Sequence, residues 1–426
     1  MTTALLTDRY ELTMLASALR DGSAHRRCVF EMFARRLPDG RRYGVVAGAD
    51  RLVEAVEQFT FDDALVGYLR DAGVADDATA EWLSGYRFSG DIDGYAEGEL
   101  YFPGSPIVTV QGTFAEAVVL ETLALSILNH DSAVASAAAR MVTAAKGRPI
   151  IEMGSRRTHE YAAVAAARAA YLAGFSATSN LEAGRRYRIP TRGTSAHSFT
   201  LLHDSEKSAF DGQVAALGLD TTLLVDTYDI TQGIRTAVEV AGPELGAIRI
   251  DSGDLGVIAS QARERLDSLG ATKTRIVVSG DLDEYAIAAL AAAPVDAYGA
   301  GTAVVTGSGA PTAGMVYKLV EVDGRPVAKR SEHKASRGGR KVAVRRHRVT
   351  GTATEEIVSS IGMPPARPHD RVLQRPLIRG GSRVDDLPSL DESREHLRRA
   401  LVSVPWEGLK LSAGEPAIQV TFTEPS

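Results

Sequence analysis

The sequence predicts an α/β protein whose central part is an irregular, TIM-like barrel of parallel β-strands. Between residues 149 and 313, short apolar runs alternate with helical stretches about seven times, as in repeated strand-then-helix units. The apolar runs lack polar residues at every second position, which indicates strands buried on both faces. Glycine follows several of the helical stretches, where a left-handed cap is expected. An open, doubly wound sheet is the alternative for this region, because the sequence alone does not close the sheet.

Composition and charge exclude several classes of protein. The chain has 426 residues, of which 44% are hydrophobic and 24% charged, so a large core and more than one domain are expected. The net charge of -6 argues against a general nucleic-acid binder. Cys28 is the only cysteine, which rules out an intrachain disulfide and a cysteine-based zinc cluster.

Two segments bear on localisation. The first residues carry Asp8 and Glu11 where a signal peptide needs an apolar run. The apolar segment 113–145 is interrupted by Glu116, Glu121 and further polar residues, so we interpret it as core helices and not as a membrane span. We therefore expect a cytoplasmic protein with no membrane partner.

Three regions are expected: an α/β domain over 1–148, the barrel over 149–313 and a C-terminal hairpin, helix and tail over 314–426. In the first region, Asp8 and Glu11 resemble a capping pair that opens a helix, and Tyr10 shares a face with apolar residues and is expected in the core. A strand over 28–35, a helix over 48–59 and a β region over 89–112 follow. Two helices then lie between 113 and 145, separated near 129–131.

The barrel region contains a histidine in the segment GTSAHSF, residues 193–199. We expect a strand at 186–190 before it and a helix that continues to Leu217 after it. Four further strands then end in polar or glycine-rich loops, each followed by a helix.

The last region begins with a predicted hairpin that turns at Asp323 and Gly324. The run from Lys334 to Arg348 is strongly basic. Its apolar residues alternate with charges and no aromatic residues are interleaved, so we interpret it as a solvated, twisted hairpin. Nucleic-acid binding and the supply of cations to an anionic substrate are the alternatives. A helix follows from about Ser389 to Leu401.

Candidate functional residues cluster at the C-terminal ends of the predicted barrel strands, where such barrels carry their reacting groups. They are Glu152, Arg156, Arg157, Thr194, His197, Asp226, Asp229, Arg249, Asp251, Asp254, Ser279, Gly280, Asp281, Gly299, Gly301 and Thr302. Asp254 and Asp281 directly open predicted helices and are expected to be helix caps. Arginine opposes the dipole at a helix N-terminus, so the arginines indicate bound anions.

Two kinds of chemistry follow from these residue types. Glycine-rich loops after the last two strands suit phosphate, and several carboxylates suit Mg²⁺. The imidazole of His197 suits acid–base catalysis or phosphoryl transfer. The residues therefore indicate a polyphosphorylated substrate and phosphoryl or phosphoribosyl transfer, without naming the substrate.

The chain resembles the nicotinate phosphoribosyltransferase family, which joins nicotinate to phosphoribosyl pyrophosphate (PRPP). The matching motifs run through nearly the whole chain: TDRYELTM (7–14), EMGSRR (152–157), GTSAHSF (193–199), LLVDTYD (223–229), IRIDSGDL (248–255), VVSGDLDE (277–284), GAGT (299–302) and YKLVE (317–321). The resemblance implies a type II phosphoribosyltransferase barrel, an N-terminal α/β domain and a C-terminal segment that packs back on it. It also implies ATP hydrolysis coupled through a phosphohistidine, Mg²⁺, and a homodimer in which the Tyr10 region of one subunit closes the site of the other.

The resemblance also implies individual roles. His197 matches the phosphoryl acceptor, and Asp226 would orient its imidazole. Nicotinate would be held by Tyr10, Thr194, Arg157 and Arg249, with Arg249 on its carboxylate. Asp251 would contact the ribose of PRPP, and the phosphates would meet Arg156, Ser279, Gly280, Gly301 and Thr302. No residue is assigned to Mg²⁺. Met153 departs from the family pattern, which commonly has a ring-stacking phenylalanine there, so ring stacking would depend more on Tyr10.

Alternatives remain at this stage. A nicotinamide- or quinolinate-using transferase belongs to the same class. A Mg²⁺-dependent phosphohydrolase with Asp226 as nucleophile belongs to another, but the segment DTYDIT lacks the D-x-D-x-T spacing that haloacid-dehalogenase enzymes use. The same segment also differs from the type I PRPP motif, because Thr227 and Tyr228 separate its two acids.

Overall fold

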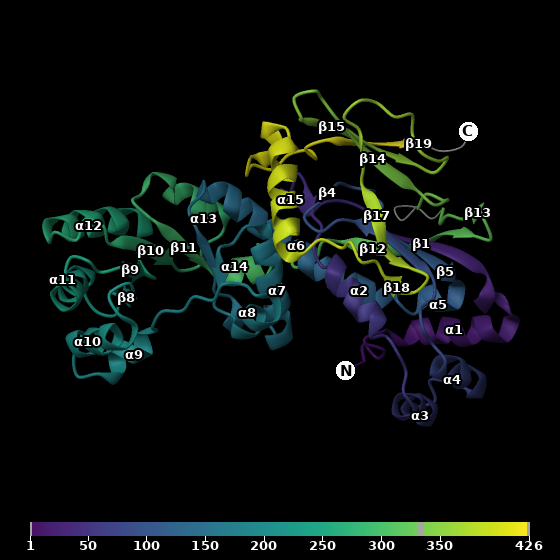
Figure 1. Ribbon diagram of the computed structural model, residues 1–426, viewed down its shortest axis with the longest axis horizontal. Helices are drawn as coiled ribbons and strands as arrows, with labels where there is room; N and C mark the ends of the chain where they lie inside the picture. Colours follow the sequence, from purple (N-terminus) through teal and green to yellow (C-terminus); the bar gives the residue numbers. More distant parts are fainter. Residues whose placement is uncertain (1, 331–335, 424–426) are drawn as a thin grey trace. The chain divides into compact units, whose positions relative to one another are not determined.

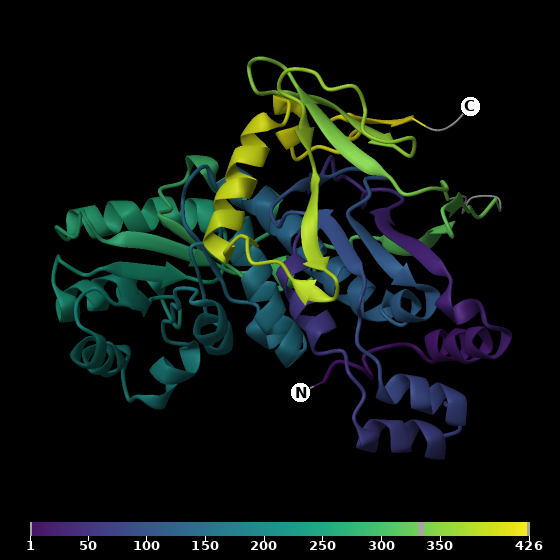
Figure 2. The same ribbon diagram turned by 45° about the vertical axis from the view of Figure 1, so that its right-hand side comes forward.

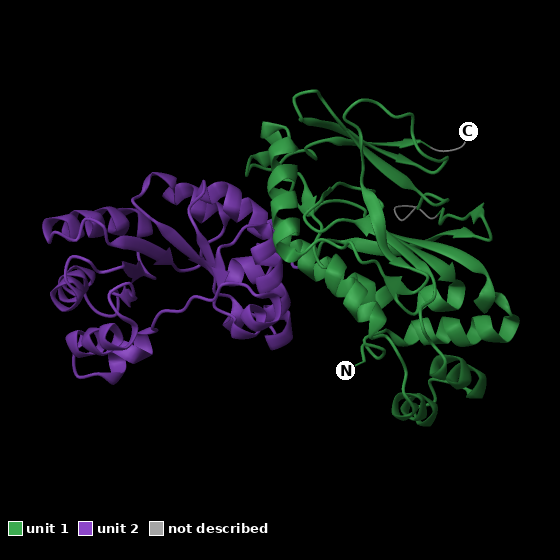
Figure 3. Ribbon diagram, in the orientation of Figure 1, with its two compact units in different colours: residues 1–136, 312–426 green, residues 137–311 purple. Residues whose placement is uncertain are grey.

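The computed structural model describes residues 2–330 and 336–423 (Figure 1). The chain divides into two compact units, of which unit 1 comprises residues 1–136 and 312–426, and unit 2 comprises residues 137–311 (Figure 3). The segment after residue 311 thus belongs to the same unit as the first 136 residues. The division into three regions at 148 and 313 stays a prediction.

Unit 1 is organised around a seven-stranded sheet in the order β13-β12-β1-β5-β3-β17-β18. The strands are β1 (Arg27–Ala34), β3 (Asp91–Tyr95), β5 (Val108–Thr113), β12 (Met315–Val322), β13 (Arg325–Pro326), β17 (Gln374–Arg379) and β18 (Ser382–Arg383). The central strand β1 pairs antiparallel with both β5 and β12, so the early and late parts of the chain share one sheet. Asp323 and Gly324 form the turn between β12 and β13 with φ of 50° and 74°, as a primed two-residue hairpin requires, and the predicted hairpin is confirmed.

The helices of the first 145 residues are α1 (Arg9–Asp21), α2 (Ala49–Glu57), α3 (Asp63–Asp71), α4 (Asp77–Ser84), α5 (Phe114–Val118) and α6 (Glu121–Ala145), and β2 (Gly44–Val45) pairs with β4 (Leu100–Tyr101). The expected break near 129–131 is wrong, because α6 is continuous there and the interruption lies before Glu121. Polar residues are tolerated within α6 because they have partners: the buried Asp131 carboxylate accepts from Arg51 Nη1 at 2.7 Å.

The start of α1 also differs from expectation. Asp8 occupies the cap position, but its side chain makes no capping hydrogen bond. Glu11 is buried and accepts a hydrogen bond from the backbone N–H of Thr122 at 2.9 Å, so it ties α1 to α6 instead of closing a capping box. Tyr10 is 45% exposed, and its placement in the core is wrong. Its ring is therefore accessible within unit 1.

The basic run forms part of a second sheet in unit 1, with the order β16-β14-β15-β19. Its strands are β14 (Val342–His347), β15 (Ala353–Ser359), β16 (Arg371–Val372) and β19 (Gln419–Thr423), and α15 (Leu390–Ser403) lies beside β4 of the same unit (Figures 1 and 2). The β14–β15 hairpin confirms the expected strand pairing, while Lys334 lies outside the described residues. The expectation that the run is solvated is wrong for Lys341 and Arg345, whose side chains are buried in ion pairs with glutamates far away in the sequence.

Unit 2 is an α/β unit with a six-stranded parallel sheet in the order β7-β6-β11-β10-β9-β8. Its strands are β6 (Ile150–Glu152), β7 (Ala177–Thr178), β8 (Thr222–Leu224), β9 (Ala247–Ile250), β10 (Arg275–Ser279) and β11 (Ala297–Ala300). Its helices are α7 (Glu160–Ala173), α8 (Leu181–Tyr187), α9 (His197–Leu202), α10 (Glu206–Leu217), α11 (Ile230–Ala241), α12 (Leu255–Ser268), α13 (Glu284–Ala289) and α14 (Thr302–Val305). The parallel strands agree with the predicted class, but the sheet of the described residues is open, and a closed barrel is not found.

The opening lies where the sequence predicted a strand at 186–190. Arg186 and Tyr187 instead end α8, and only Thr191 forms a single bridge with Thr178 of β7. Pro190 has no N–H to donate to a ladder, which explains why pairing does not extend along this segment. The predicted helix reaching Leu217 is also split, into α9 and α10.

Within residues 2–330 and 336–423, one stretch, Phe114–Ala145, is long and apolar enough to cross a membrane by length and composition. Of its most apolar window, 67% is buried inside the protein, as is typical of a core helix.

Candidate active site

The candidate residues of unit 2 lie along one edge of the parallel sheet. Asp226 follows β8, Asp251 follows β9, Ser279 is the last residue of β10 and Gly301 follows β11. These four strands are neighbours in the sheet, in the order β11-β10-β9-β8. Because parallel strands end on the same side, chain segments that are far apart in sequence deliver their polar groups to one place.

His197 is the first residue of α9, and its imidazole has two neighbours from the loop after β8. Its Nδ1 lies 3.1 Å from Oγ1 of Thr227, and its Nε2 lies 3.8 Å from Oδ1 of Asp226. The His197 side chain is 40% exposed, whereas that of Asp226 is 1% exposed. The imidazole is thus open to a ligand on one side and faces a buried carboxylate on the other.

The Asp226 carboxylate is held in place through Oδ2, the oxygen that is not the one near His197. Its Oδ2 accepts hydrogen bonds from the backbone N–H of Asp251 and from Oγ of Ser252, each at 2.8 Å. Its Oδ1 is buried and has no hydrogen-bond partner within the described residues. The oxygen that faces His197 is therefore the one that the rest of the protein leaves unsatisfied.

Arg249 and Asp251 form the next part of the cluster. Arg249 lies in β9, and its Nη1 donates to Oγ1 of Thr194. Burial lowers the pKa of Arg249, although Asp251 and Asp226 act in the opposite direction. Oδ1 of Asp251 accepts from Oγ of Ser279 at 2.5 Å. The structure thus brings Thr194, His197, Asp226, Arg249, Asp251 and Ser279 into one hydrogen-bonded and charged cluster.

Glycines at the ends of β10 and β11 allow close approach of the backbone. A Cβ at Gly280 would lie 2.4 Å from the carbonyl oxygen of Asp251, and the φ of Gly280 is 117°, which favours glycine. A Cβ at Gly299 would lie 2.8 Å from Sδ of Met153, so the Met153 side chain covers β11 at this point. Gly301 precedes α14, and Thr302 is its first residue.

Other predicted residues either stabilise the fold of unit 2 or make no hydrogen bond or ion pair with this cluster in the described structure. Glu152 is buried and accepts from Oγ1 of Thr178 at 2.5 Å, which joins β6 to β7. Arg156 and Arg157 are exposed after β6 and make no ion pair in the part of the chain that the structure describes. Asp254 caps α12 as expected, whereas Asp281 does not cap α13, because Asp283 does.

Comparison with known proteins bears on what this cluster does. Residues 5–129 match the model of the nicotinate phosphoribosyltransferase (NAPRTase) N-terminal domain, and residues 149–355 match that of the NAPRTase family. Nicotinate phosphoribosyltransferase pncB1 of Mycobacterium tuberculosis is 66% identical over 424 residues, which cover 97% of this chain and 94% of that protein. The chain belongs to the nicotinate phosphoribosyltransferase family.

Two further members of this family show how far the similarity extends. Nicotinate phosphoribosyltransferase of Bacillus subtilis is 39% identical over 337 residues, covering 76% of this chain and 68% of that protein. The crystal structure of human nicotinic acid phosphoribosyltransferase superposes with a TM-score of 0.85 at 27% identity, covering 98% of this chain and 97% of that chain. The resemblance inferred from the motifs is therefore confirmed across both units.

Sequence reasoning missed three residues of this cluster in the nicotinate phosphoribosyltransferase chain. Thr227 contacts His197 and Ser252 contacts Asp226, and both directly follow a residue that was singled out. Glu206 opens α10, and burial, together with Asp229 and Asp226, raises its pKa to about 7. Because the sequence placed residue 206 inside one long helix, only the split between α9 and α10 reveals it.

Tyr10, which lies in unit 1, has a perturbed hydroxyl. Burial, followed by the charges of Glu121 and Glu11, raises its pKa to about 12, so the hydroxyl stays protonated at neutral pH. The roles of Tyr10 and of the individual residues of unit 2 stay predictions.

Proposed function

We propose that this protein transfers the phosphoribosyl group of PRPP to nicotinate and couples the transfer to ATP hydrolysis through a phosphorylated His197. The 66% identity to a nicotinate phosphoribosyltransferase over 97% of the chain carries the assignment of the transfer. The unsatisfied Asp226 Oδ1 beside Nε2 of His197 supports the coupling step. We also propose that the open sheet of unit 2 is a type II phosphoribosyltransferase barrel interrupted between β7 and β8.

Nicotinate would be bound by the Arg249 side of the cluster. The half-buried Arg249 guanidinium has a neutral hydroxyl, that of Thr194, as its hydrogen-bond partner, and its buried Nε has none within the described residues. The carboxylate of nicotinate would offset the desolvation of this cation. Arg157 and the accessible ring of Tyr10 would add a second cation and a stacking surface.

PRPP would be bound by the glycine-rich edge. Backbone N–H groups at Gly280 and Gly301, with Ser279, Thr302 and Arg156, would hold the phosphates, and Asp251 would contact the ribose. In the transfer, the bond from C1 of the ribose to pyrophosphate breaks as the pyridine nitrogen of nicotinate bonds to C1. Pyrophosphate leaves with the electron pair, and the binding groups align the two reactants and stabilise the departing charge.

His197 would receive the γ-phosphoryl group of ATP. Asp226 would hold Nε2 protonated, which leaves the lone pair on Nδ1 to attack phosphorus, with the Thr227 hydroxyl turning away. The P–O bond to ADP breaks as the N–P bond forms, and water later releases phosphate. While phosphorylated, His197 would add negative charge and acceptor oxygens beside the PRPP site and so change its affinity for substrates.

Mg²⁺ does not fit a site formed by the protein alone. Among residues 2–330 and 336–423, no group of three or more His, Cys, Asp or Glu side chains is placed to hold a metal ion. We therefore propose that Mg²⁺ arrives with the phosphates of PRPP and ATP and is not held by the protein alone.

Several wider properties are part of the proposal. We infer a cytoplasmic homodimer with shared active sites, in which the Tyr10 region of one subunit completes the site of the other, and with small-molecule substrates only. The family resemblance supports the dimer, and the single, buried, free Cys28 is consistent with a reducing compartment. The phosphohydrolase alternative is not favoured, because Asp226 is 1% exposed and its Oδ2 already accepts two hydrogen bonds.

Two measurements test the proposal. Turnover of nicotinate, nicotinamide and quinolinate with PRPP, each with and without ATP, should show preference for nicotinate and stimulation by ATP. Incubation with γ-labelled ATP should leave an acid-labile phosphate on the wild-type protein and not on His197→Ala, with His203→Ala as a matched control in the same loop region. Equal labelling of His197→Ala and wild type would show that another residue is phosphorylated.

A further inference from the structure

A cationic cavity lies in unit 1. Its volume is about 530 Å³, and its walls carry three arginines and three histidines: Arg348, Arg371, Arg399, His347, His369 and His396. They come from the end of β14 and the turn after it, from the start of β16 and the loop before it, and from helix α15. All of them belong to unit 1, whereas the cluster around His197 belongs to unit 2.

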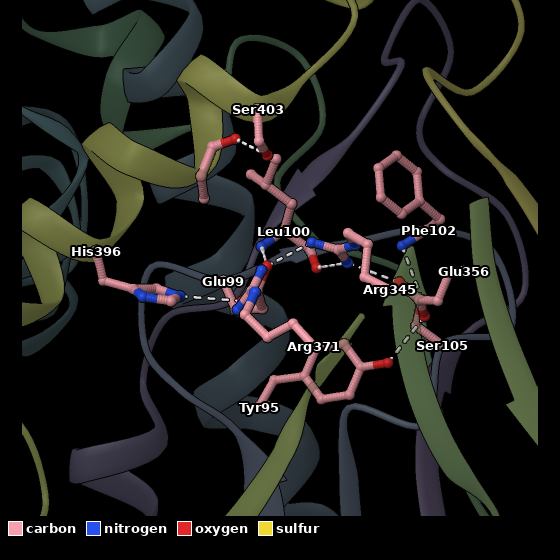
Figure 4. A network of polar contacts seen from close by, with 11 residues as sticks. Tyr95, Glu99, Leu100, Phe102, Ser105, Arg345, Glu356, Arg371, His396 and Ser403 are labelled. Carbon is pink, nitrogen blue, oxygen red and sulfur yellow. Dashed lines mark hydrogen bonds and ion pairs between the residues drawn. The ribbon is translucent and has the colours of Figure 1, made fainter. Parts of the chain in front are cut away.

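A buried network holds two of these residues in place (Figure 4). The carboxylate of Glu99, which is 1% exposed, accepts from Nη1 of Arg371 and lies 3.0 Å from Nε2 of His396. The same carboxylate accepts from Nη1 of the buried Arg345. Glu99 therefore holds Arg371 and His396 in place at the cavity wall. Their side chains remain accessible, because they are 38% and 27% exposed.

The remaining cations of the wall are poorly neutralised. Arg348 makes no ion pair within the described residues, and Arg399 approaches Glu395 only to 4.0 Å while Arg398 holds that carboxylate at 2.8 Å. Asp370 is the one carboxylate among the lining residues, and its Oδ2 already accepts from the backbone N–H of Arg367 at 3.0 Å. The cavity thus has an excess of positive charge.

The imidazole of His347 supports this description. Its Nδ1 lies 3.2 Å from the carbonyl oxygen of His369, so Nδ1 carries the proton, and Nε2 can donate to a ligand only when the ring takes up a second proton. Burial, followed by the charge of Arg371, lowers the pKa of His347, which shows that a further positive charge is disfavoured there. An anion bound beside the ring would offset the charge of Arg371 and favour this second proton.

We propose that this cavity binds a phosphate-bearing small molecule. Planar guanidinium groups from three separate segments, those of Arg348, Arg371 and Arg399, match phosphate oxygens, and the volume lies in the range of about 300–1,000 Å³ that is usual for small-molecule sites. The cavity is lined by residues of unit 1 alone and shares none of them with the cluster around His197, so the inference does not depend on the proposed function.

Isothermal titration calorimetry of the full-length protein with pyrophosphate tests this inference. The wild type should show one more binding site per subunit than the double variant Arg348→Ala/Arg399→Ala, or that variant should bind at this site at least ten-fold more weakly. Separate titrations with inorganic phosphate and AMP distinguish a bare phosphate from a nucleotide as the preferred ligand. Arg348→Lys/Arg399→Lys should retain binding more closely than the alanine variant.

Arg20→Ala/Arg70→Ala is the matched control, because it removes two exposed arginines of unit 1 that lie outside the cavity. Both double variants should keep the wild-type thermal midpoint and catalytic rate. Equal stoichiometry and affinity in wild type and Arg348→Ala/Arg399→Ala, or equal losses in the two double variants, would overturn the inference.

Discussion

Unit 1 and unit 2 each bury carboxylates beside basic side chains, but the two units differ in how many of the carboxylate oxygens have hydrogen-bond partners. In unit 1, both oxygens of Glu356 have partners, with Tyr95 and Ser105 donating to one at 2.8 and 2.6 Å and Arg345 donating to the other at 2.6 Å (Figure 4). In unit 2, one oxygen of Asp226 is satisfied and the other faces His197 without a hydrogen bond in the described part of the chain. A fully satisfied carboxylate fixes the fold, whereas a half-satisfied one is available to a ligand or a reacting group.

The pKa values follow the same contrast. Burial alone would raise the pKa of Glu99 in unit 1, but Arg345, His396 and Arg371 together hold it well below its usual value. Glu206 in unit 2 makes no ion pair within the residues that the structure describes, and burial, followed by the charges of Asp229 and Asp226, raises its pKa to about 7. Four substitutions test whether the two regions differ in this way.

Arg345→Met should have the largest effect. It leaves Glu356 without its cation and takes one cation from Glu99, both in the interior, so the free energy of unfolding should fall by about 4 kcal/mol. Urea denaturation followed by circular dichroism measures it. The exposed pair Arg185–Glu182 supplies the control, because Arg185→Met should leave the midpoint unchanged. Similar midpoints for the two variants would refute a structural role for the Arg345 network.

Arg249→Ala should act on substrate recognition and not on the fold. Loss of this half-buried cation should lower kcat/KM for nicotinate by a few hundred-fold, or about 3 kcal/mol, and reduce the preference for nicotinate over nicotinamide. Steady-state kinetics with both substrates measures it, and the free energy of unfolding should not decrease. An unchanged preference would mean that another residue recognises the carboxylate.

Asp226→Asn should affect phosphorylation of His197 while preserving the surrounding hydrogen bonds. The amide oxygen can still accept from Asp251 N–H, but the amide N–H₂ would then face Nε2 of His197 and favour the wrong tautomer. We expect phosphorylation from ATP to slow on the order of 100-fold, or about 2.7 kcal/mol, in rapid-quench measurements. A rate within two-fold of wild type would remove Asp226 from the orienting role.

Glu206→Gln should show the smallest effect, and one that depends on pH. The pKa of Glu206 is about 7 in the folded protein against an ordinary value of 4.5, so the folded state binds the proton more tightly than the unfolded state. Its contribution to stability is complete below the unfolded pKa and is lost as the pH rises through 7. Between pH 5 and pH 8, wild type should lose about 1 kcal/mol relative to Glu206→Gln, a value reduced for solvent screening. Parallel pH profiles of the two proteins would contradict the raised pKa.

Much of unit 2 follows from local sequence. Its strand-then-helix rhythm is evident in the sequence, and parallel strands place their C-terminal ends on one edge, so Asp226, Asp251 and Ser279 could be grouped before their contacts were known. The strand at 186–190 was mispredicted because local β propensity does not reveal whether a partner strand is available. Glu206 was missed for a related reason, since its environment depends on where α9 ends.

Unit 1 was harder to predict because its polar residues find partners far away in the sequence. Glu11 bonds to Thr122, Lys341 pairs with Glu31, and Arg345 pairs with Glu99, so neither a capping pattern nor a run of charges indicates that they are buried. The prediction for Tyr10 failed in the opposite direction. Its position on the helix suggests the core, whereas its ring is exposed.

The sequence by itself determined the α/β class and the family, and it indicated candidate residues in GTSAHSF and at the strand ends, because residue type and periodicity are local properties. Only the tertiary structure decided that the sheet is open between β7 and β8 and that Asp226 turns one unsatisfied oxygen toward His197. It also decided that Arg345 of the basic run joins a buried network, whereas Arg348 lines a cationic cavity. Burial and hydrogen-bond partnership depend on which distant segments meet, and a charged side chain has no local signal that distinguishes solvent from a buried partner.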